Sequence, residues 1–268
     1  MTGVFISPER AQALIQGGAA PIDARSKSAR IHRRIPGSGS LKWLSHRAGA
    51  GRTGLLSEGL PSLAQAIAAA GVSASRPVVV YGEADKAWGE EGRIFWMLEH
   101  LGHGQVHIVD GGVQAWEAAG LPMKRLTSPA QRGDFEPQWG QGRARVEQVI
   151  LAQQAAPHSL WDCRTQEEFE GATPFGEARG GHIPGARHLF WKALMDDGGR
   201  LLPEQELRTL LRGFEEPVLP MCTGGVRAGF CYAVLRELGM ETALYDGSMW
   251  EWAKRSELPV TSGPDGPR

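Results

Sequence analysis

One cysteine stands in a setting that favours a reactive thiol. Cys222 follows a strand-like run, and Gly224 and Gly225 separate it from Arg227 and a helix-like run. In α/β proteins, ligands bind at the carboxyl ends of strands. A glycine-rich turn there can point backbone N–H groups inward as a nest for an anion, and the next helix adds its positive dipole end. We therefore predict a thiol of lowered pKa, ionised at neutral pH, with Arg227 as a fixed positive charge beside it.

The three cysteines differ in what surrounds them. A free cysteine is more often a small buried hydrophobic residue than a catalyst. The strand-to-helix position, the two glycines and the arginine favour a reactive site for Cys222. Cys231 lies on the apolar side of the helical run, so we expect it to pack in the core. Cys163 follows Asp162, and we expect packing there too, at a place that could border the pocket.

The elements that position Cys222 read as strands alternating with helices. The runs VVVY (78–81) and VHIV (106–109) are short, apolar and β-branched, which is typical of buried parallel strands. The runs RIFWMLEHLG (93–102) and AGFCYAVLRELG (228–239) have helical character, and each ends at a glycine. This alternation predicts an α/β fold with parallel sheets flanked by helices.

The chain contains two related halves. PIDAR (21–25) corresponds to LWDCR (160–164), and RIPGSGSLKW (34–43) corresponds to HIPGARHLFW (182–191). Gly82 stands where the second copy has Cys222. We predict an N-terminal domain over residues 1–126, a linker over 127–142, where turn residues are frequent, and a C-terminal domain over 143–268.

Composition limits the function classes. The 268 residues are 41% apolar and 22% charged with a net charge of −1, so we expect a globular protein that binds neither nucleic acid nor membrane surfaces. We see no secretory signal and no apolar run long enough for a membrane helix. Three cysteines cannot form a disulfide framework, and no Cys/His spacing indicates zinc. A cytoplasmic location is the simplest inference.

These features together resemble one family. Two copies of Asp-x-Arg and Ile-Pro-Gly, the loop CTGGVRA (222–228) and the run YDGSMWEW (245–252) resemble the tandem-domain rhodaneses, the thiosulfate and 3-mercaptopyruvate sulfurtransferases. The resemblance implies two rhodanese-like domains, the first catalytically silent, and no metal or organic cofactor. It implies that Cys222 takes a sulfane sulfur from a small anionic donor as a persulfide. The sulfur then passes to cyanide or a thiol, a protein thiol included.

The resemblance also assigns roles around Cys222. The substrate would contact the loop residues and two arginines: Thr223, Gly224, Gly225, Val226, Arg227 and Arg164. Asp162 and Trp250 would support the site. The Asp-x-Arg pair has two interpretations, because Arg164 either meets the anionic end of the donor or forms a structural ion pair with Asp162. We favour the structural role, since the silent copy has the same pair, and we expect His182 to be structural as well.

Several positions depart from the patterns that set donor specificity. Gly224 stands where thiosulfate-specific members have lysine and mercaptopyruvate-specific members have serine. Glu168 replaces a second arginine of the thiosulfate enzymes, and Arg34 replaces a histidine of the mercaptopyruvate enzymes. We hypothesise that Arg227 restores the lost positive charge from a new position, so that Arg227→Ala should raise the donor KM more than it changes alkylation of Cys222.

Two other function classes share parts of this pattern. Cysteine phosphatases also place a thiolate and an arginine around an anion, but their loop usually has a histidine before the cysteine and one more residue before the arginine. A non-catalytic module that binds a partner is the other alternative, and it suits the first copy. The intact cysteine loop of the second copy favours a sulfurtransferase over both.

Overall fold

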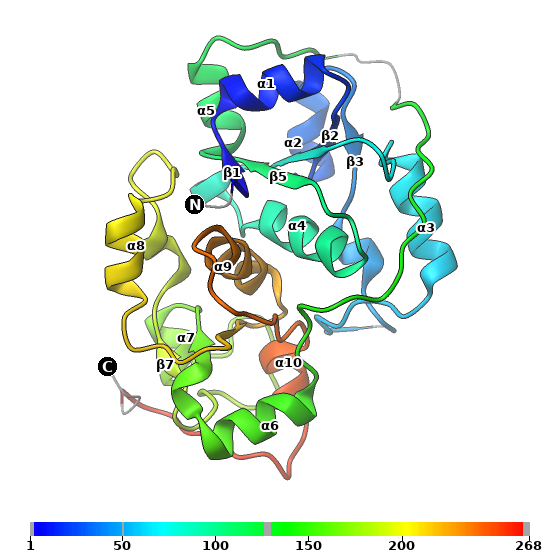
Figure 1. The fold of residues 1–268 in the computed structure, drawn as a ribbon. Coiled ribbons are helices and arrows are strands. Elements are labelled where there is room, and N and C mark those ends of the chain that lie inside the picture. Colours follow the sequence, from blue (N-terminus) through cyan, green and yellow to red (C-terminus); the bar gives the residue numbers. More distant parts are fainter. Residues whose placement is uncertain (1–2, 50, 126–129, 265–268) are drawn as a thin grey trace.

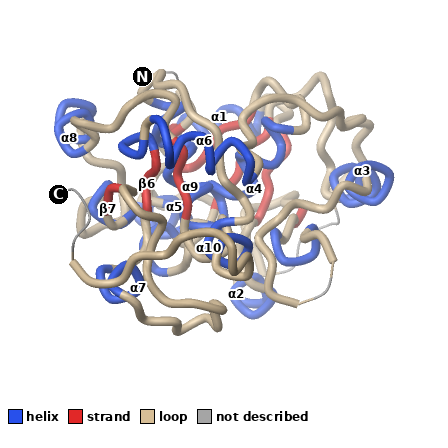
Figure 2. The backbone as a smooth tube through the Cα atoms, turned by 90° about the horizontal axis from the view of Figure 1, so that it is seen from below, coloured by secondary structure: helices blue, strands red, loops and turns tan. Residues whose placement is uncertain are grey.

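Two parallel sheets form the framework of the protein. The computed structural model describes residues 3–49, 51–125 and 130–264. The first sheet has the order β1-β5-β4-β2-β3, and the second has the order β7-β6-β8, with every pairing parallel. Helices and loops surround the strands, as the tube view shows (Figure 2). The predicted α/β class with helices flanking parallel sheets is confirmed.

The first domain holds the larger sheet. Its elements are β1 (Phe5–Ile6), α1 (Pro8–Gln16), β2 (Ala20–Asp23), α2 (Lys27–His32), β3 (Gly39–Ser40), η1 (Trp43–His46), α3 (Leu60–Ala69), β4 (Val78–Tyr81), η2 (Ala84–Lys86), α4 (Glu90–His100), β5 (Val106–Val109) and α5 (Gly112–Ala118). The predicted strands at 78–81 and 106–109 are β4 and β5, and the predicted helix at 93–102 lies mostly within α4. All four residues of β4 are buried, which agrees with its unbroken apolar sequence.

The second domain holds the cysteine loop. Its elements are α6 (Val146–Ala155), η3 (Pro157–Ser159), β6 (Leu160–Asp162), α7 (Gln166–Glu170), β7 (Arg187–His188), η4 (Trp191–Leu194), α8 (Glu204–Leu210), β8 (Leu219–Met221), α9 (Val226–Glu237) and α10 (Ser248–Trp252). The predicted helix at 228–239 is α9, which begins two residues earlier because the loop ends at Gly225.

The duplication seen in the sequence is also present in the topology. In the first sheet, β4 lies between β2 and β5, and β5 continues to β1. In the second sheet, β8 pairs with β6, and isolated parallel bridges join Val218 to Thr242 and Leu244 to Arg143. These bridges occupy the places of β5 and β1, so the two domains share one strand order. The predicted boundaries at residues 126 and 143 stay a prediction.

Helices α4 and α9 join the two domains. They pack against each other between the sheets, near the centre of the molecule (Figure 1). The packing is close because a Cβ on Gly92 would collide with the backbone of Phe230, and one on Gly229 would lie 2.7 Å from the Cα of Arg93. One buried apolar cluster runs through both domains and includes Trp96, Phe230 and Cys222. The cysteine loop is therefore held against the first domain by a shared core.

Candidate active site

The loop after β8 surrounds the sulfur of Cys222. Cys222 directly follows the last residue of β8 and is 1% exposed. Gly225, the N-cap of α9, has a φ of 76° and points its N–H at the sulfur, 3.1 Å away. The backbone N–H of Cys222 itself donates to the hydroxyl of Ser248, 3.1 Å away, at the start of α10. The loop thus has the anion-binding form that its sequence predicts.

The surroundings of Cys222 favour its ionised form. Burial acts to raise the pKa of the thiol, but the Cys163 thiol and the charge of Arg227 act in the opposite direction, together with backbone N–H groups of the loop and of α9. The net effect is a pKa well below the ordinary value for cysteine. The direction of this shift favours the thiolate, which is the nucleophilic form of cysteine.

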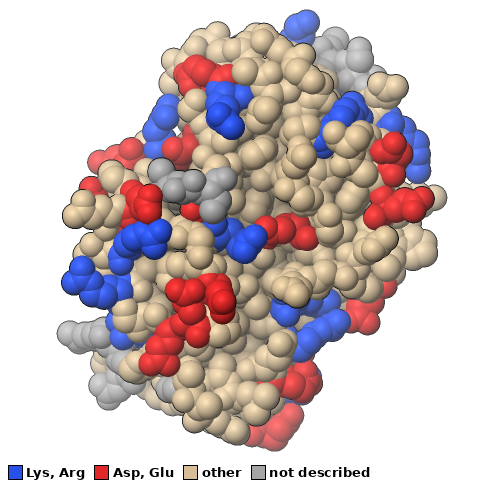
Figure 3. All heavy atoms as spheres, viewed as in Figure 1, with Lys and Arg blue, Asp and Glu red and all other residues tan. Residues whose placement is uncertain are grey.

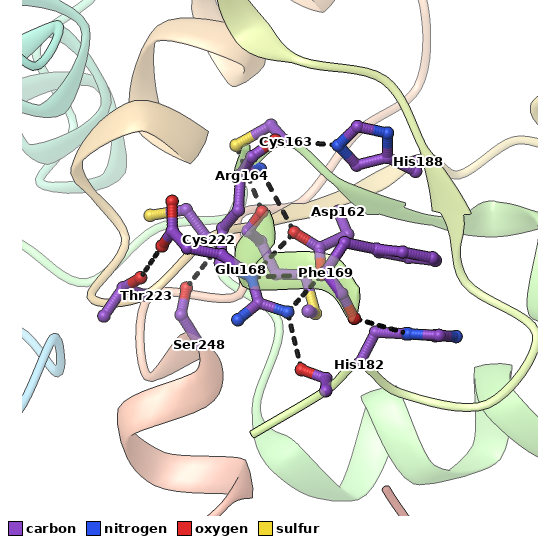
Figure 4. A network of polar contacts seen from close by, with 12 residues as sticks. Asp162, Cys163, Arg164, Glu168, Phe169, His182, His188, Cys222, Thr223 and Ser248 are labelled. Carbon is purple, nitrogen blue, oxygen red and sulfur yellow. Dashed lines mark hydrogen bonds and ion pairs between the residues drawn. The ribbon is translucent and has the colours of Figure 1, made fainter. Parts of the chain in front are cut away.

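Cys163 lies beside Cys222 because β6 and β8 are paired in register. Asp162 pairs with Met221, so Cys163 and Cys222, which directly follow these two residues, lie side by side at the ends of neighbouring strands (Figure 4). Burial and the neighbouring thiols raise the pKa of Cys163 well above its ordinary value, so it stays protonated. Its sulfur lies 3.1 Å from the carbonyl oxygen of Met221. Cys163 and Cys231 are both buried in the core, as expected from the sequence.

Replacing Cys163 with alanine should make the Cys222 thiol less acidic. The variant removes a hydrogen bond that lowers the pKa of Cys222, so the midpoint of its alkylation by iodoacetamide should move to higher pH. Cys231→Ala is the matched control, because Cys231 is equally buried and contacts Cys163. A midpoint that stays in place in Cys163→Ala, or that moves equally in both variants, would contradict this role.

Arg227 reaches the site, but its charge is compensated. Its guanidinium donates to both carboxylate oxygens of Glu168, at 2.6 and 2.8 Å, and to the hydroxyl of Thr223 at 2.8 Å. That hydroxyl lies 2.8 Å from Glu168 and 3.2 Å from Glu177. Arg227 and Glu168 are 3% and 2% exposed. Arg227 provides the expected positive charge beside Cys222, and Glu168, which replaces the family arginine, is its ion-pair partner. The proposed role of Arg227 in donor binding stays a prediction.

Arg164 is paired with Asp162 and lies outside the lining of the Cys222 pocket. It donates two hydrogen bonds to Asp162, at 2.6 and 2.9 Å, and one to the carbonyl of Gly181 at 2.7 Å (Figure 4). Its side chain is 1% exposed and does not line the pocket. Asp23 and Arg25 form the same pair in the first domain. This geometry supports the structural interpretation of the pair, and a role of Arg164 in substrate binding stays a prediction.

His182 is also structural. Its Nδ1 lies 2.9 Å from the carbonyl oxygen of Phe169, and its ring stacks on that of Phe169 with 3.6 Å between ring centroids. Burial is the main reason that its pKa lies below the ordinary value for histidine. The neutral, buried ring braces the chain beside the Asp162–Arg164 pair (Figure 4).

The two glycines of the loop serve different purposes. Only Gly225 has a positive φ. Gly224 is required for a steric reason, because a Cβ there would collide with the indole of Trp250. Gly224 and Trp250, which were both predicted to belong to the site, therefore lie directly against each other. Of the positive φ and the close approach that this turn requires, Gly225 provides the first and Gly224 the second.

A pocket of about 170 Å³ opens above Cys222. Five of the predicted residues line it, namely Thr223, Gly224, Val226, Arg227 and Trp250. Three further lining residues were not predicted, namely Trp43, Trp88 and Phe175. Trp43 had one signal in the sequence, since it aligns with Trp191 of the other copy. Trp88 and Phe175 lie in segments without a period, so only the packing of the two domains places them here.

The first domain has no counterpart of the thiol. A Cβ on Gly82 would collide with the carboxylate of Glu91, which fills the space where the second copy has its sulfur. Glu91 is 1% exposed, and burial raises its pKa to about 8. A buried acid in place of a nucleophile agrees with the prediction that this domain is silent.

Comparison with known proteins decides the family. The rhodanese-like domain family matches the chain twice, over residues 7–119 and 146–255. The chain belongs to the rhodanese family. Each match falls within one of the two predicted domains, and the family prediction from the sequence is confirmed.

Curated relatives of this rhodanese are sulfurtransferases. It is 31% identical over 211 residues to a thiosulfate sulfurtransferase of Pseudomonas aeruginosa, with 75% of this chain and 76% of that protein covered. It is 32% identical over 209 residues to a probable 3-mercaptopyruvate sulfurtransferase of the same organism, with 75% and 73% covered. A mitochondrial thiosulfate/3-mercaptopyruvate sulfurtransferase of Arabidopsis thaliana is 27% identical, with 75% of this chain but only 60% of that protein covered.

The structural likeness extends over both rhodanese domains. A crystal structure of a 3-mercaptopyruvate sulfotransferase from Escherichia coli superposes with a TM-score of 0.79 and 24% identity, covering 92% of this chain and 99% of that one. This likeness shows the fold. Within the part of the chain that the structure describes, no helix has the length and apolar character to span a bilayer. Basic and acidic side chains are interspersed on the face in Figure 3.

Proposed function

We propose that this rhodanese moves a sulfane sulfur from thiosulfate or a related small anionic donor to a thiophilic acceptor through a persulfide on Cys222. The observation that carries the proposal is the buried sulfur of Cys222 at the floor of a pocket, where the N–H of Gly225 donates to it at 3.1 Å. The surroundings also lower the pKa of this thiol. Membership of a family whose curated relatives are sulfurtransferases supports it. The acceptor is cyanide or a thiol, a protein thiol included, and a cytoplasmic location stays a prediction.

Each half of the reaction uses the same thiolate. With thiosulfate, the Cys222 thiolate attacks the outer sulfur, the S–S bond of the donor breaks, and sulfite leaves with the electron pair. The negative terminal sulfur of the persulfide is then held by the N–H groups of the loop. In the second half the acceptor attacks that terminal sulfur. The bond to Cys222 breaks, and the cysteine leaves as a thiolate of low pKa, which makes it a good leaving group.

The proposal has two candidate sulfur donors, thiosulfate and 3-mercaptopyruvate. Thiosulfate carries two negative charges, and the guanidinium of Arg227 that faces the pocket is already paired with Glu168. We therefore expect a high KM for thiosulfate, and 3-mercaptopyruvate is the alternative donor. Steady-state kinetics with both donors and cyanide as acceptor, run side by side, would rank them. A mass gain of one sulfur atom on Cys222 identifies the intermediate, and no gain with any donor would instead support a non-catalytic module.

The phosphatase alternative has less support from the geometry. A phosphatase arginine must be free to bind the phosphate oxygens, whereas Arg227 is held in two hydrogen bonds by Glu168. Only four residues separate Cys222 from Arg227. We expect no turnover of p-nitrophenyl phosphate under conditions that give sulfur transfer, and the reverse result would favour a phosphatase.

A further inference from the structure

The walls of the Cys222 pocket are aromatic and come from both domains. Trp43 and Trp88 belong to the first domain, and Phe175 and Trp250 belong to the second. The rings of Trp88 and Phe175 meet edge to face with 5.4 Å between centroids. The indole N–H of Trp250 donates to the carbonyl of Phe175, 3.2 Å away, which fixes that ring. Four rings thus surround the approach to one thiolate.

The charges around this pocket leave little attraction for an anion. Among the described residues that line it, Arg227 is the only one with a basic or acidic side chain, apart from the thiolate of Cys222. Glu168 pairs with it in two hydrogen bonds, and the carboxylate of Glu177, 7% exposed, lies behind Thr223. A second anion entering here would find one guanidinium already shared between acidic neighbours.

The same arrangement disfavours a cationic ligand. The guanidinium carbon of Arg227 lies 5.5 Å from the centroid of the Trp88 ring and 5.6 Å from that of the Phe175 ring. These are the distances of cation–π contacts, so Arg227 already uses two of the four rings. A second cation would have to displace Arg227 from these two rings to make a cation–π contact with them. The walls are therefore complementary to an uncharged apolar group.

The volume of the pocket indicates the size of that group. Its 170 Å³ is close to the roughly 150 Å³ of a protein cavity known to hold benzene. Thiosulfate and cyanide are much smaller than this and would contact only the loop at the floor. The structure leaves room for one ring-sized body beside the sulfur.

We infer that the sulfur acceptor is a thiol with an uncharged, ring-sized apolar body that lies between the four aromatic residues. This inference rests on the proposed persulfide chemistry. The acceptor thiol loses its proton to solvent, and its sulfur attacks the terminal sulfur of the Cys222 persulfide. The bond between that sulfur and Cys222 breaks, the Cys222 thiolate leaves with the electron pair, and the acceptor departs as a persulfide. No oxidant or reductant is required.

A binding experiment tests the pocket without any sulfur transfer. Benzyl methyl sulfide has the ring but no thiol, and it should protect Cys222 of the wild-type protein from iodoacetamide. Three comparison ligands replace the ring with a small, an anionic or a cationic group. They are ethyl methyl sulfide, 2-(methylthio)ethanesulfonate and 2-(methylthio)ethyl-trimethylammonium, respectively. We expect the benzyl compound to protect at a concentration about tenfold lower than any of the others, from burial of the ring. Stronger protection by an ion of either sign, or equal protection by all four, would overturn the inference.

A kinetic experiment then tests the acceptor. Protein carrying the Cys222 persulfide is mixed with benzyl mercaptan or 2-mercaptoethanol at equal thiolate concentration, and loss of the extra sulfur is followed by mass. We expect about tenfold faster transfer to benzyl mercaptan at low concentration. In Trp88→Leu this ratio should fall severalfold. In the control Trp139→Leu, which changes an exposed tryptophan outside the described lining of the pocket, the ratio should stay the same.

The two experiments separate the inference from the proposed function. If no donor places sulfur on Cys222 but benzyl methyl sulfide still protects it, the sulfurtransferase proposal fails and the apolar ligand class stands. If the persulfide forms and transfers to both thiols at the same rate, the proposed function stands and the inference is wrong.

Discussion

Replacing Cys222 with serine is expected to reduce sulfur transfer by at least about 10³-fold. A hydroxyl is not ionised at neutral pH and forms no persulfide, so both halves of the reaction lose their nucleophile. The measurement is turnover of thiosulfate and of 3-mercaptopyruvate with cyanide, together with intact mass after incubation with each donor. The variant should show no mass gain.

The matched control is Cys231→Ala, in which a cysteine of the same buried cluster is removed. It should retain both the turnover and the mass gain of one sulfur atom. Thermal unfolding of the wild-type protein and both variants checks that the folds are intact. We expect Cys222→Ser to fold, because serine keeps the volume of this 1% exposed side chain close to that of cysteine. Substantial transfer by Cys222→Ser would refute the persulfide mechanism.

Replacing Arg227 with methionine is expected to lower the free energy of unfolding by about 3 to 5 kcal/mol, because it leaves Glu168 buried without its partner. Burial acts to raise the pKa of Glu168, and the hydrogen bonds and charge of Arg227 outweigh it, so that the pKa lies below the ordinary value. In wild type, the stabilisation from this group is therefore present above the unfolded pKa and is lost as the pH falls through the folded one. The loss should be measured by urea unfolding at neutral pH.

The same variant should change the reactivity of Cys222. The charge of Arg227 lowers the pKa of the thiol, so in Arg227→Met the midpoint of alkylation should move to higher pH. From the sequence, we expected substitution of Arg227 to affect the donor KM more than the alkylation of Cys222. From the structure, we expect the larger effect on alkylation. The reason is that Arg227 is committed to Glu168.

A double variant separates the two effects. Glu168→Gln with Arg227→Met removes both charges, while the glutamine can still accept the hydrogen bond from the Thr165 N–H that caps α7. We expect it to regain at least about half of the lost stability but not the low pKa of Cys222. If the double variant were no more stable than Arg227→Met, the pair would not be the source of the loss.

The sequence was sufficient to predict much of this protein because the relevant signals are local. Strands β4 and β5 are short apolar runs, helices α4 and α9 are each followed two residues later by a glycine, and the loop at Cys222 has its glycines and arginine within six residues. The repeated Asp-x-Arg and Ile-Pro-Gly motifs revealed the duplication. Each of these features depends on residues that are close together in the sequence, so it can be predicted from the sequence alone.

The contacts that the sequence did not indicate lie between distant segments. Glu168 and Arg227 are 59 residues apart and pair only because α7 and α9 meet at the same edge of the sheet. Gly224 leaves room for the ring of Trp250, a partner that the loop sequence does not indicate. No periodicity or residue spacing in the sequence indicates either contact, because both contacts depend on burial and on the direction in which side chains point.

By itself, the sequence determined the α/β fold, the duplication and the loop that holds Cys222, since backbone propensity, apolar periodicity and a glycine-rich turn act over a few residues. The tertiary structure decided the electrostatics and shape of the site. Packing of α4 against α9 brings Trp43 and Trp88 of the first domain over Cys222, and burial turns Arg227 and Glu168 into a pair. Charge compensation and pocket walls arise where segments meet in space, because only there does the removal of water set the strength of each contact.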